Sequence, residues 1–461
     1  MMSSAKGVAL VVGFGASGAA AARRLREEGY EVTVVDDGPG EPAPGDAAAM
    51  GVALVKHPSL QRLAELVRGA QEVVVSPGVP PHHRVFSISG GPRPVGEVEL
   101  AWRRAKAPIV AITGTNGKTT VATLVARMLA CSGVEAALGG NIGTPLTDVV
   151  AKAVSGVIVA EVSSFQLALT SSFRPKVGVW LNLAEDHLDW HPDLEHYVGA
   201  KARIWRSQGP SDVAIANQED PVVIERARSA RGRLVTFGLR SGDYHLSSDG
   251  LMSPDGTLIV ERTRIRRDMA FELSNALAAC AASLEAGASI DGCREALESF
   301  DGLEHRVELV REIDGVRYVD DSKATTPAAV LAALDDFYSV VLIAGGRNKG
   351  LSMAALQRGS ERLRGVVAIG EAAAEIEEAL GASSPVTIAQ SMSAAVAAAS
   401  AMAHPGDTVL LSPGCASFDW YRSYADRGDD FKRLVNAIGA RGASETPRVV
   451  SCGDSRGRGT R

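Results

Sequence analysis

The sequence predicts an α/β protein of about three domains, each built around a mainly parallel sheet. Its 461 residues are more than a single domain with one hydrophobic core usually contains. Short apolar runs typical of buried strands alternate with longer stretches whose apolar residues recur at helical spacing. Several of these runs lead directly into glycine-rich or polar segments, and ligands bind at that edge of an open parallel sheet.

Two breaks in this alternation indicate the domain boundaries. Residues 87–96 are rich in proline and glycine and are expected to form a loop, followed by a short helix over residues 97–106. Residues 302–306 indicate a hinge into the last domain. We therefore predict domains at residues 1–97, 98–303 and 304–443, and disorder for the polar, Arg/Gly-rich residues 444–461.

The composition is typical of a soluble globular protein, with 46% hydrophobic and 22% charged residues. A net charge of −6 creates no overall positive field that would favour nucleic acid or an anionic membrane. No apolar stretch is long enough to span a bilayer, and the glycine spacing within residues 7–22 favours a strand and turn over a signal peptide. The five cysteines are odd in number and lack metal-type spacing, which indicates free thiols. We expect a cytoplasmic monomer without nucleic-acid or membrane partners.

The N-terminal region carries a complete GxGxxG pattern between two expected strands. Apolar Val8–Val12 is followed by Gly13–Gly18, by an alanine-rich helix to about Glu28, and by a second strand over residues 31–35 that ends at Asp36. This arrangement predicts a Rossmann-like βαβ unit that holds a diphosphate at a helix N-terminus. Taken alone it also suits an NAD(P)-dependent oxidoreductase with Asp36 on a ribose, and that alternative stays open here.

Residues 108–120, PIVAITGTNGKTT, have the layout of a phosphate-binding loop. Ile109–Ile112 is typical of a buried strand, and residues 121–130 have apolar side chains at helical spacing. Glycines between them let backbone N–H groups close around phosphate oxygens at the helix N-terminus. Lys118 would reach the β- and γ-phosphates of a nucleotide, and the Thr119 hydroxyl would ligate Mg²⁺. The predicted ATP-binding loop comprises Gly114, Thr115, Asn116, Gly117, Lys118, Thr119 and Thr120.

One departure keeps a simpler interpretation of this loop open. The general Walker pattern has a glycine five positions before Gly117, where this chain has Ile112. An ordinary strand-to-helix turn that carries a lysine would show the same local pattern. The coincidence of glycine, Lys118 and Thr119 between a strand and a helix favours nucleotide binding.

Four polar side chains downstream of the loop carry weaker signals. Glu161 ends an expected strand, where a carboxylate suits a Mg²⁺ ligand, although a helix-capping glutamate would look the same. His187 and His191 have the spacing of a zinc protease helix, but Leu188 stands where that motif needs glutamate, so zinc hydrolysis is disfavoured. Lys201, within an expected helix over residues 195–204, has the pattern of a solvated lysine.

The remaining chain again alternates between strands and helices. Residues 236–264 are expected to form a small antiparallel excursion, followed by an alanine-rich helix over residues 271–286. Strands at residues 316–320, 340–344, 366–370 and 408–411, with a helix between successive strands, predict a second doubly wound domain. Loops at the C-terminal ends of these strands bring Lys323, Thr325 and Lys349 to one edge, although each lysine taken singly could be a solvated charge.

The string GTNGKTT at Gly114–Thr120 resembles the phosphate loop of the Mur ligases and folylpolyglutamate synthases, which form amide bonds with ATP. Four further strings are similar to Mur ligase strings in order and spacing, at residues 160–167, 182–191, 321–325 and 411–419. The resemblance covers nearly the whole chain except the C-terminal tail. The chain is identified as a member of the Mur ligase family, which implies a central P-loop domain between two Rossmann-like domains.

The resemblance implies an ATP-dependent ligase of peptidoglycan precursor synthesis that adds D-glutamate to UDP-N-acetylmuramoyl-L-alanine. ATP would convert the substrate carboxylate to an acyl phosphate, the D-glutamate amine would attack, and ADP and phosphate would be released. Two Mg²⁺ ions are implied, with Thr119, Glu161 and His187 among their ligands, together with a carbamylated Lys201. Carbamylation suits the site because CO₂ turns a cation that would repel Mg²⁺ into a carboxylate. The implied catalytic residues are Lys118, His187 and Lys201.

The resemblance also implies three sets of substrate contacts. Beyond the loop, ATP would contact Asn275, Arg306 and Asp321. Only Asn275 carries over from the family's His-Asn pair, because Phe271-Glu272 stand near the start of that helix. The UDP substrate would contact Gly15, Ala16, Ser17, Asp36, Asn141 and the segment Ser76, Pro77, Gly78 that follows an expected strand. The incoming amino acid would contact Lys323, Thr325, Lys349, Ser417, Phe418 and Tyr424, whose two lysines suit a dicarboxylate.

Several functional alternatives remain at this point. Within the family, Asn116 counts against the ligase that adds L-alanine, and the lack of an Asp-Asn-Pro-Arg string counts against the diamino-acid ligase. The dipeptide and folate ligases are further family alternatives, and a variant that adds L-glutamate is not excluded by any motif. Outside the family, an oxidoreductase would leave the phosphate loop and the third domain without a role. A regulatory nucleotide-binding protein without catalysis is the other alternative.

Overall fold

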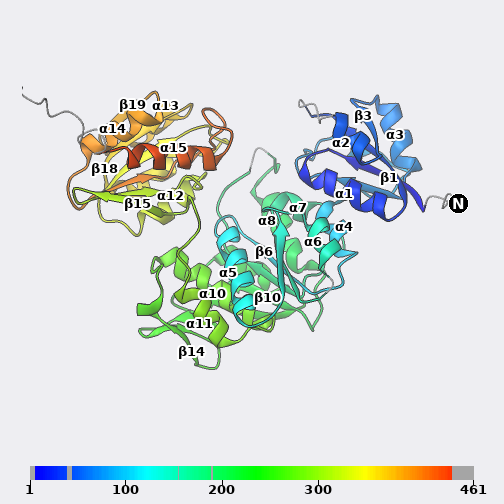
Figure 1. Cartoon of the computed structure of the whole chain (residues 1–461), viewed down its shortest axis with the longest axis horizontal. Helices are drawn as coiled ribbons and strands as arrows, with labels where there is room; N and C mark the ends of the chain where they lie inside the picture. The colour runs from blue at the N-terminus through cyan, green and yellow to red at the C-terminus, as the bar shows by residue number, and fades with distance from the viewer. Residues whose placement is uncertain (1–5, 39–43, 154, 188–189, 439–461) are drawn as a thin grey trace, which may run out of the picture. The chain divides into compact units, whose positions relative to one another are not determined.

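A computed structural model describes residues 6–38, 44–153, 155–187 and 190–438. These residues form three sheets of mainly parallel strands with helices packed against them, which confirms the predicted fold class (Figure 1). Two compact units are distinguished: the described residues up to Leu303 together with Lys349–Leu351, and the other described residues from Glu304 onward. The predicted tail at 444–461 lies outside the described residues.

The N-terminal sheet is wholly parallel, with the strand order β3-β2-β1-β4-β5. Its strands are β1 Gly7–Val12, β2 Tyr30–Asp36, β3 Ala53–Lys56, β4 Glu72–Val75 and β5 Val95–Gly96. Its helices are α1 Ala16–Glu27, α2 Pro44–Ala49, α3 Leu60–Gly69 and the 3-10 turn η1 Arg84–Ser87. A Cβ at Gly18 would lie 1.9 Å from the carbonyl oxygen of Gly13, so glycine is what lets α1 start against β1.

The central sheet has nine strands in the order β14-β13-β12-β11-β10-β9-β6-β8-β7. Its strands are β6 Ile109–Thr113, β7 Ala136–Gly140, β8 Val157–Glu161, β9 Val177–Trp180, β10 Val213–Asn217, β11 Arg233–Gly238, β12 Tyr244–Leu246, β13 Gly250–Met252 and β14 Leu258–Glu261. The pairings β12–β13 and β13–β14 are antiparallel, which confirms the predicted excursion, whereas β12 joins β11 in parallel.

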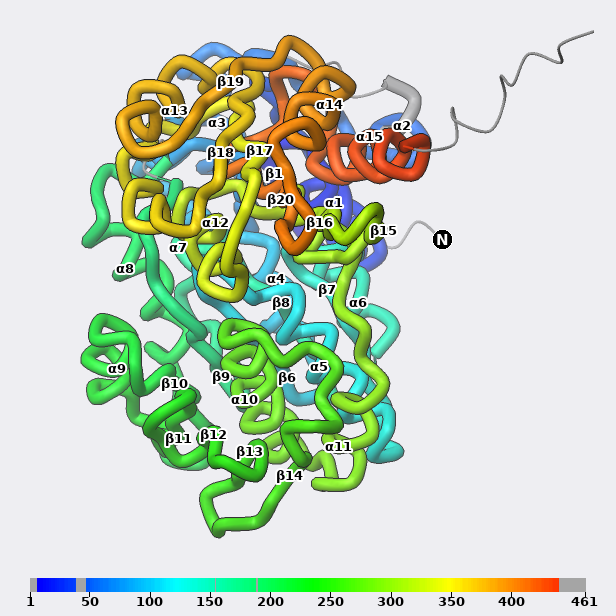
Figure 2. The backbone as a smooth tube through the Cα atoms, turned by 90° about the vertical axis from the view of Figure 1, so that its left-hand side faces the viewer, coloured from blue at the N-terminus to red at the C-terminus, as the bar shows by residue number. Residues whose placement is uncertain are grey.

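Helices cover both faces of the central sheet. They are α4 Glu97–Trp102, α5 Lys118–Cys131, α6 Leu146–Lys152, α7 Ser164–Ala168, α8 Leu194–Arg206, α9 Pro221–Ala227, η2 Arg262–Arg264, α10 Ala270–Glu285 and α11 Ile290–Glu298. Strand β6 is buried throughout, and its side chains alternate between two cores. Val110 and Ile112 pack on the side of α5, α10 and α11, which lie together in Figure 2, and Ala111 packs on the side of α4 and α8.

The C-terminal sheet has the order β15-β16-β20-β17-β18-β19, and only its edge strand β15 is antiparallel. Its strands are β15 Glu308–Ile313, β16 Val316–Asp320, β17 Val340–Gly345, β18 Leu363–Ile369, β19 Val386–Ala389 and β20 Thr408–Leu411. Its helices are α12 Pro327–Leu334, η3 Met353–Arg362, α13 Ala373–Leu380, α14 Met392–Met402 and α15 Tyr424–Asn436.

Four local expectations need correction. The helix expected over residues 97–106 ends at Trp102, and the loop expected at 87–96 ends in the short strand β5. The helix expected between β17 and β18 is the 3-10 segment η3. Edge strands β15 and β19 were not expected, because both expose part of their apolar residues, such as Leu309 and Ile388.

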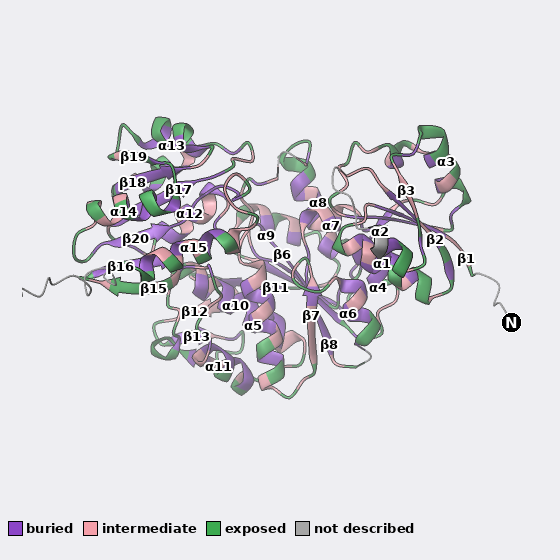
Figure 3. Cartoon of the chain, turned by 45° about the horizontal axis from the view of Figure 1, so that its top comes forward, coloured by how far each residue is buried: buried purple, intermediate pink, exposed green. Residues whose placement is uncertain are grey.

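Burial follows the layering of each domain. Buried residues concentrate in the strands, and the outward faces of the helices are exposed (Figure 3). No helix within the described residues is both long and apolar enough to cross a membrane. The four described cysteines, Cys131, Cys280, Cys293 and Cys415, form no disulfide with one another, and Cys452 lies outside the described residues.

Candidate active site

The phosphate loop connects the buried strand β6 to the N-terminus of α5. Gly117 caps the helix in the left-handed conformation with φ 83°. A Cβ at this position would also lie 2.3 Å from the side-chain oxygen of Asn275. Both the left-handed backbone and the close approach of Asn275 therefore require glycine at position 117. Asn275, on α10, lies directly beside the loop, where its predicted contact with ATP would be possible.

Asn182, which follows β9, holds the first part of the loop. Its side-chain oxygen accepts hydrogen bonds from the backbone N–H groups of Thr115 (3.1 Å) and Asn116 (2.9 Å). Its side-chain amide donates back to the carbonyl oxygen of Asn116 at 3.2 Å. The N–H groups at the first turn of α5 lie beyond these bonds, in the position where helix N-termini bind phosphate. Asn182 had no role in the sequence-based prediction.

Lys118 lies across the loop that precedes it. Its ammonium donates to the carbonyl oxygens of Gly114 (2.9 Å) and Thr115 (2.7 Å). A second lysine meets the same segment, because the ammonium of Lys201 donates to the carbonyl oxygen of Gly114 at 2.7 Å. The structure thus brings together two residues that lie 83 positions apart in the sequence, Lys118 and Lys201.

Oxygen ligands gather next to the loop around Glu161, at the end of β8. The Thr119 hydroxyl donates to one carboxylate oxygen at 2.9 Å, and the Asn141 amide donates to the other at 2.8 Å. The alternative role of Glu161 as a helix cap is wrong, since Ser163 caps α7 with a reciprocal bond pair to Gln166. Hydroxyl and carboxylate oxygens are the ligands that Mg²⁺ prefers.

Lys201 is buried, with 2% of its surface exposed, so its interpretation as a solvated lysine is wrong. Its ammonium lies 4.6 Å from the centre of the Tyr197 ring. Burial and the charge of Lys118 hold the pKa of Lys201 well below its ordinary value, although Asp186 opposes that shift. Its environment therefore favours the neutral amine, which is the form that reacts with CO₂.

Asp186 and Tyr197 complete the surroundings of Lys201. Asp186 accepts the backbone N–H of His187 at 2.9 Å, and its second oxygen lies 3.2 Å from Nε2 of His187. The Tyr197 hydroxyl lies 3.1 Å from the hydroxyl of Thr115, in the phosphate loop. The backbone of His187 adopts a left-handed conformation, with φ 58°, which is uncommon for a residue other than glycine and often occurs at functional sites.

The ring nitrogens of His191 and His187 have different polar partners. Its Nε2 lies 3.0 Å from the hydroxyl of Ser164 at the start of α7, and its ring is buried beside Phe165. His187 instead contacts the edge of Phe165 and bonds Asp186. Both rings thus contact Phe165, but their nitrogens have different partners, Asp186 for His187 and Ser164 for His191.

A pocket of about 570 Å³ lies at the C-terminal edge of the N-terminal sheet. Gly13 has φ 87° and its carbonyl oxygen accepts a hydrogen bond from the Ser76 hydroxyl at 2.8 Å, which joins the loops after β1 and β4. Asp36 ends β2 and accepts the backbone N–H of Gly38 at 2.8 Å. The pocket brings together seven predicted residues: Gly15, Ala16, Ser17, Asp36, Ser76, Pro77 and Gly78.

Asp37 also lines this pocket, although the prediction gave the role to Asp36 alone. His83 and Arg84 each approach one oxygen of Asp37 to 3.0 Å. Burial works against ionisation, but the hydrogen bonds from His83 and Arg84 outweigh it and hold the pKa of Asp37 below its ordinary value. Asp37 is thus a fixed anion beside Asp36.

The edge of the C-terminal sheet brings several predicted residues together. The ammonium of Lys323 lies 3.5 Å from the centre of the Tyr424 ring, a cation–π contact. Asp321 accepts a hydrogen bond from the Ser412 hydroxyl at 2.8 Å, and burial raises the pKa of Asp321 to about 7, although the charge of Arg306 opposes this. Of the other predicted residues, Thr325 is half-buried, Ser417 is buried and Phe418 is 63% exposed. Lys349 follows β17 in sequence, but it belongs to the compact unit that includes the described residues up to Leu303, and its ammonium lies 3.2 Å from Asp186.

Arg427 ties two loops of this edge together and had no predicted role. Its guanidinium donates to the hydroxyl (3.0 Å) and carbonyl (2.8 Å) oxygens of Ser322 and to the carbonyl oxygen of Cys415 (3.1 Å). Burial lowers the pKa of Arg427 to about 10. Because Arg427 is only 1% exposed, its guanidinium stabilises the two loops and is not accessible to a ligand from solvent.

Two family models and several known proteins match this chain. The Mur ligase middle domain matches residues 112–283, and the Mur ligase glutamate ligase domain matches residues 305–415. The UDP-N-acetylmuramoylalanine–D-glutamate ligase of Pelotomaculum thermopropionicum is 39% identical over 447 residues, which cover 93% of this chain and 97% of that protein. The enzyme of the same name from Frankia casuarinae is 44% identical over 446 residues, which cover 93% of each. This chain belongs to the Mur ligase family.

Solved structures of other Mur ligases share the fold of this Mur ligase. UDP-N-acetylmuramate–alanine ligase MurC from Thermotoga maritima has a TM-score of 0.59 at 18% identity, with coverage of 94% of this chain and 100% of that one. MurF ligase from Thermotoga maritima in complex with ADP has a TM-score of 0.60 at 18% identity, with coverage of 94% and 96%. At this identity the likeness concerns the fold alone.

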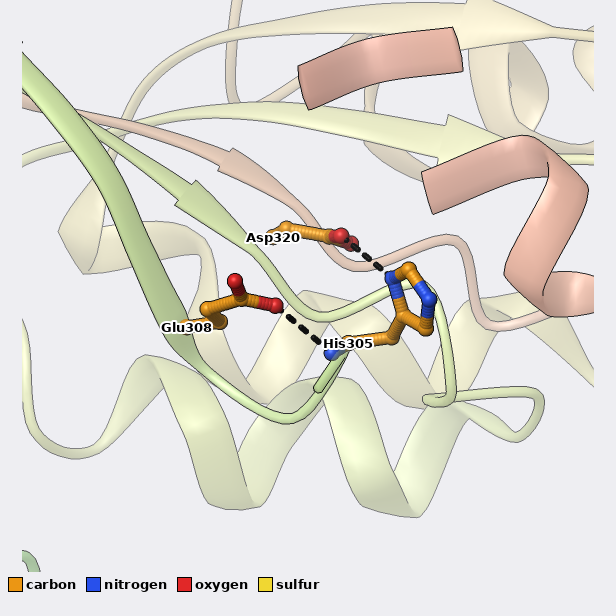
Figure 4. A group of neighbouring side chains, drawn as sticks. All are labelled: His305, Glu308 and Asp320. Atoms are coloured by element: carbon orange, nitrogen blue, oxygen red, sulfur yellow. Dashed lines mark hydrogen bonds and ion pairs between the residues drawn. The ribbon is translucent and has the colours of Figure 1, made fainter. Parts of the chain in front are cut away.

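A buried histidine anchors the start of the C-terminal unit of this Mur ligase. His305 has φ 61°, and its Nδ1 lies 2.7 Å from a carboxylate oxygen of Asp320 (Figure 4). Its backbone N–H donates to Glu308 at 2.9 Å. A Cβ at Gly428 would lie 2.2 Å from Nδ1 of His305, so α15 passes close over the pair. The imidazole of His305 and the carboxylates of Glu308 and Asp320 are close enough together to hold a metal ion. The ammonium of Lys432 lies 3.3 Å from Glu308, however, and already supplies a positive charge to that carboxylate.

Replacing His305 with glutamine should lower the melting temperature of the protein most at mildly acidic pH. The Asp320 hydrogen bond raises the pKa of His305 above that of a free histidine, about 6.5. The stabilisation is complete below the unfolded-state pKa and is lost as the pH rises through the folded-state pKa. Thermal unfolding followed by circular dichroism should show the gap from wild type narrowing as pH rises. His404→Gln, an exposed site, is the control, and a gap that does not change with pH would refute the charged pair.

Proposed function

We propose that this Mur ligase joins D-glutamate to UDP-N-acetylmuramoyl-L-alanine and converts ATP to ADP and phosphate. The observation that carries the proposal is the convergence of Lys118, Glu161 and buried Lys201 on one phosphate loop. The relatives named UDP-N-acetylmuramoylalanine–D-glutamate ligase support the choice of substrates, since they match nearly the full length of both chains. We assign the UDP substrate to residues 1–97, ATP to 98–303 and the amino acid to 304–443.

The reaction needs ATP because a free carboxylate has no good leaving group. A carboxylate oxygen of UDP-N-acetylmuramoyl-L-alanine attacks the γ-phosphorus, and ADP leaves with the electrons of the broken P–O bond. The neutral amine of D-glutamate then attacks the acyl carbon, the C–O bond breaks, and inorganic phosphate leaves as the amide forms and the amine loses a proton. Lys118 and the N-terminal N–H groups of α5 would stabilise the charge on the transferring phosphoryl group.

The oxygen atoms beside the loop fit Mg²⁺. Thr119 and Glu161 already point to one another at 2.9 Å, and both are hard oxygen ligands. We infer that these two residues, with His187 and carbamylated Lys201, would hold two ions. Bound Mg²⁺ would neutralise negative charge on the phosphates of ATP.

The surroundings of Lys201 support its carbamylation, as does the family resemblance. The side chain is buried, lies next to the ammonium of Lys118 and contacts the carbonyl oxygen of Gly114. A second cation in a buried site is unfavourable, whereas a carbamate would complement Lys118. The amine nitrogen attacks CO₂, one proton is released, and the side chain changes from a neutral amine to an anion.

The remaining assignments follow the three sheet edges. Asp36 and the glycine loops around it would hold the UDP group, with Asn141 towards the sugar, and Arg306, Asp321 and Asn275 would serve ATP. The residues at the amino-acid site would be Lys323, Thr325, Lys349, Ser417, Phe418 and Tyr424. A cytoplasmic monomer without nucleic-acid or membrane partners remains our expectation.

Replacing Asp36 with alanine should raise KM for the UDP substrate and leave KM for ATP nearly unchanged. Asp36 lies in the pocket of the N-terminal sheet and not at the phosphate loop. Loss of a charged hydrogen bond is worth about 1.5–3 kcal/mol, which corresponds to a rise of about tenfold or more. Glu31→Ala, at an exposed position on the same strand, is the matched control. Equal effects on both KM values would contradict the assignment.

Steady-state ADP release with a panel of amino acids tests the proposal as a whole. D-Glutamate should support release in the presence of UDP-N-acetylmuramoyl-L-alanine, whereas L-glutamate, L-alanine and a diamino acid should not. NADH fluorescence on the same preparation tests the oxidoreductase alternative. Tight NADH binding without amino-acid-dependent ADP release would favour that alternative over the ligase.

A further inference from the structure

Helix α8 has a second face that the proposed ligase reaction does not use. Lys201 points from α8 towards the phosphate loop. At about 100° per residue, Gly199, Arg203 and Arg206 lie roughly 140–160° around the helix from Lys201. These residues therefore face away from the phosphate loop, on the opposite side of α8.

Two pockets meet on this opposite face. The first, the arginine pocket, has a volume of about 480 Å³ and is lined by Arg203, Arg206, Arg226 and Arg231, together with Trp205 and several small side chains. The second, the aromatic pocket, has a volume of about 450 Å³ and is lined by apolar groups that include Phe86, Leu169 and Trp190. Both are lined by Gly199 and Arg203, and no atom lies within 4 Å of where a Cβ at Gly199 would be.

The arginine pocket has an excess of positive charge. No carboxylate is among the described residues that line it. Glu195, at the border of the aromatic pocket, binds Arg226 through both oxygens at 2.7 and 2.8 Å. Arg206 and Arg231 are exposed and form no ion pair or side-chain hydrogen bond with any residue that the structure describes. At least two guanidinium groups are thus available to an anion.

Arg203 is held in place at the junction of the two pockets. Its guanidinium donates to the carbonyl oxygens of Ala168 (2.7 Å) and Thr170 (3.0 Å), through one of its two terminal nitrogens. Burial, together with the charges of Arg206 and Arg93, lowers the pKa of Arg203. An anion in the pocket would relieve this repulsion, and guanidinium groups bind phosphate with paired hydrogen bonds.

The aromatic pocket offers a different chemistry next to this charge. Phe86 and Trp190 supply ring surface, and His196 and Glu195 supply polar groups at the border. Such a combination of apolar walls and a few polar groups suits a planar heteroaromatic ring, which can stack and be read at its edge.

We propose that the two pockets form one binding site for a nucleotide, separate from both the ATP loop and the UDP pocket. The base would occupy the aromatic pocket, the ribose would pass over Gly199, and one or two phosphates would lie among the arginines. Each pocket falls within the range of about 300–1,000 Å³ that is typical of small-molecule sites. This second nucleotide site goes beyond the ligase reaction, because none of its lining residues has a role in that reaction.

Photoaffinity labelling of the full chain with 8-azido-ADP, followed by peptide mapping, tests the proposal. We expect label on peptides that contain Phe86 or Trp190, in addition to label on the phosphate loop. Arg206→Glu combined with Arg231→Glu should reduce the Phe86/Trp190 label at least tenfold and leave the phosphate-loop label unchanged. Arg206→Gln with Arg231→Gln, a milder change at the same exposed positions, should reduce the same label in part.

A control pair with the same charge change separates site binding from overall charge. Arg228 and Arg240 are exposed and line neither pocket. Their double change to glutamate should leave the Phe86/Trp190 label intact, and an equal loss would overturn the proposal. Label confined to the phosphate loop and the UDP pocket would also overturn it. Displacement of the Phe86/Trp190 label by inorganic pyrophosphate as effectively as by ADP would refute a role for the base.

Discussion

Replacing Lys118 with alanine should abolish measurable ADP formation while the protein remains folded. The ammonium of Lys118 lies over the phosphate loop, within hydrogen-bond reach of two loop carbonyl oxygens. With nucleotide bound it would meet the transferring phosphoryl group. Loss of one such charged contact should reduce kcat about a thousandfold, which corresponds to about 4 kcal/mol of transition-state stabilisation. The measurement is ADP release under saturating substrates, with circular dichroism to verify folding.

The control for this change is a lysine outside the site. Lys152 lies exposed at the end of α6, so Lys152→Ala removes the same charge from the protein without touching the loop. Its rate should remain within about twofold of wild type, since surface substitutions have small effects. If Lys118→Ala turned over at a near-normal rate, the phosphate-loop assignment would be wrong.

Replacing Lys201 with alanine should also inactivate the enzyme, and a small carboxylate should restore part of the rate. The side chain is buried 2.7 Å from the carbonyl oxygen of Gly114, so its removal leaves a space beside the loop. Formate or acetate can supply there the carboxylate that the carbamate would have provided. Rates of ADP release with and without added formate, at constant ionic strength, measure the effect.

Two further variants separate a carbamate from a structural lysine. Lys201→Arg should fail as well, because arginine keeps its positive charge and does not form the carbamate. Formate should not rescue Lys118→Ala, whose missing group is a cation. Ordinary activity in Lys201→Arg, or a plain ammonium on Lys201 in the active Mg²⁺-bound enzyme, would disprove carbamylation.

The sequence predicted the glycine turns at the ends of strands better than it predicted the distant residues that these turns contact. Glycine turns directly after apolar runs identified Gly13–Gly18 and Gly114–Thr120, because a tight turn at a strand end is a local feature. The partners of those turns come from distant segments. The hydrogen bond between Asn182 and Asn116 in the phosphate loop joins residues 66 positions apart, and no local sequence pattern predicts it.

Lys201 shows where a local signal existed but was not used. Tyr197, Ile204 and Trp205 are buried on the same helix, four before, three after and four after Lys201. That spacing places Lys201 on the apolar face of α8. A lysine on the buried face of an amphipathic helix is unusual enough to indicate a functional position.

Other features could not be predicted without the tertiary fold. The proximity of Asp186 to Lys201 and the bond between the Tyr197 and Thr115 hydroxyls depend on how α8 packs against the loop. The buried Arg427 looks like an ordinary helical arginine in the sequence. Edge strands β15 and β19 were missed because partly exposed strands lack a continuous apolar run.

Transfer of ¹⁸O from substrate to phosphate tests the central claim most directly. In the proposed reaction a carboxylate oxygen of UDP-N-acetylmuramoyl-L-alanine becomes the bridging oxygen of the acyl phosphate, and the C–O bond breaks when the D-glutamate amine attacks. Substrate labelled with ¹⁸O in that carboxylate should therefore release inorganic phosphate that carries one ¹⁸O atom for each amide formed. Phosphate without ¹⁸O, formed alongside ADP, would show that the carboxylate is not phosphorylated and would contradict the ligase mechanism.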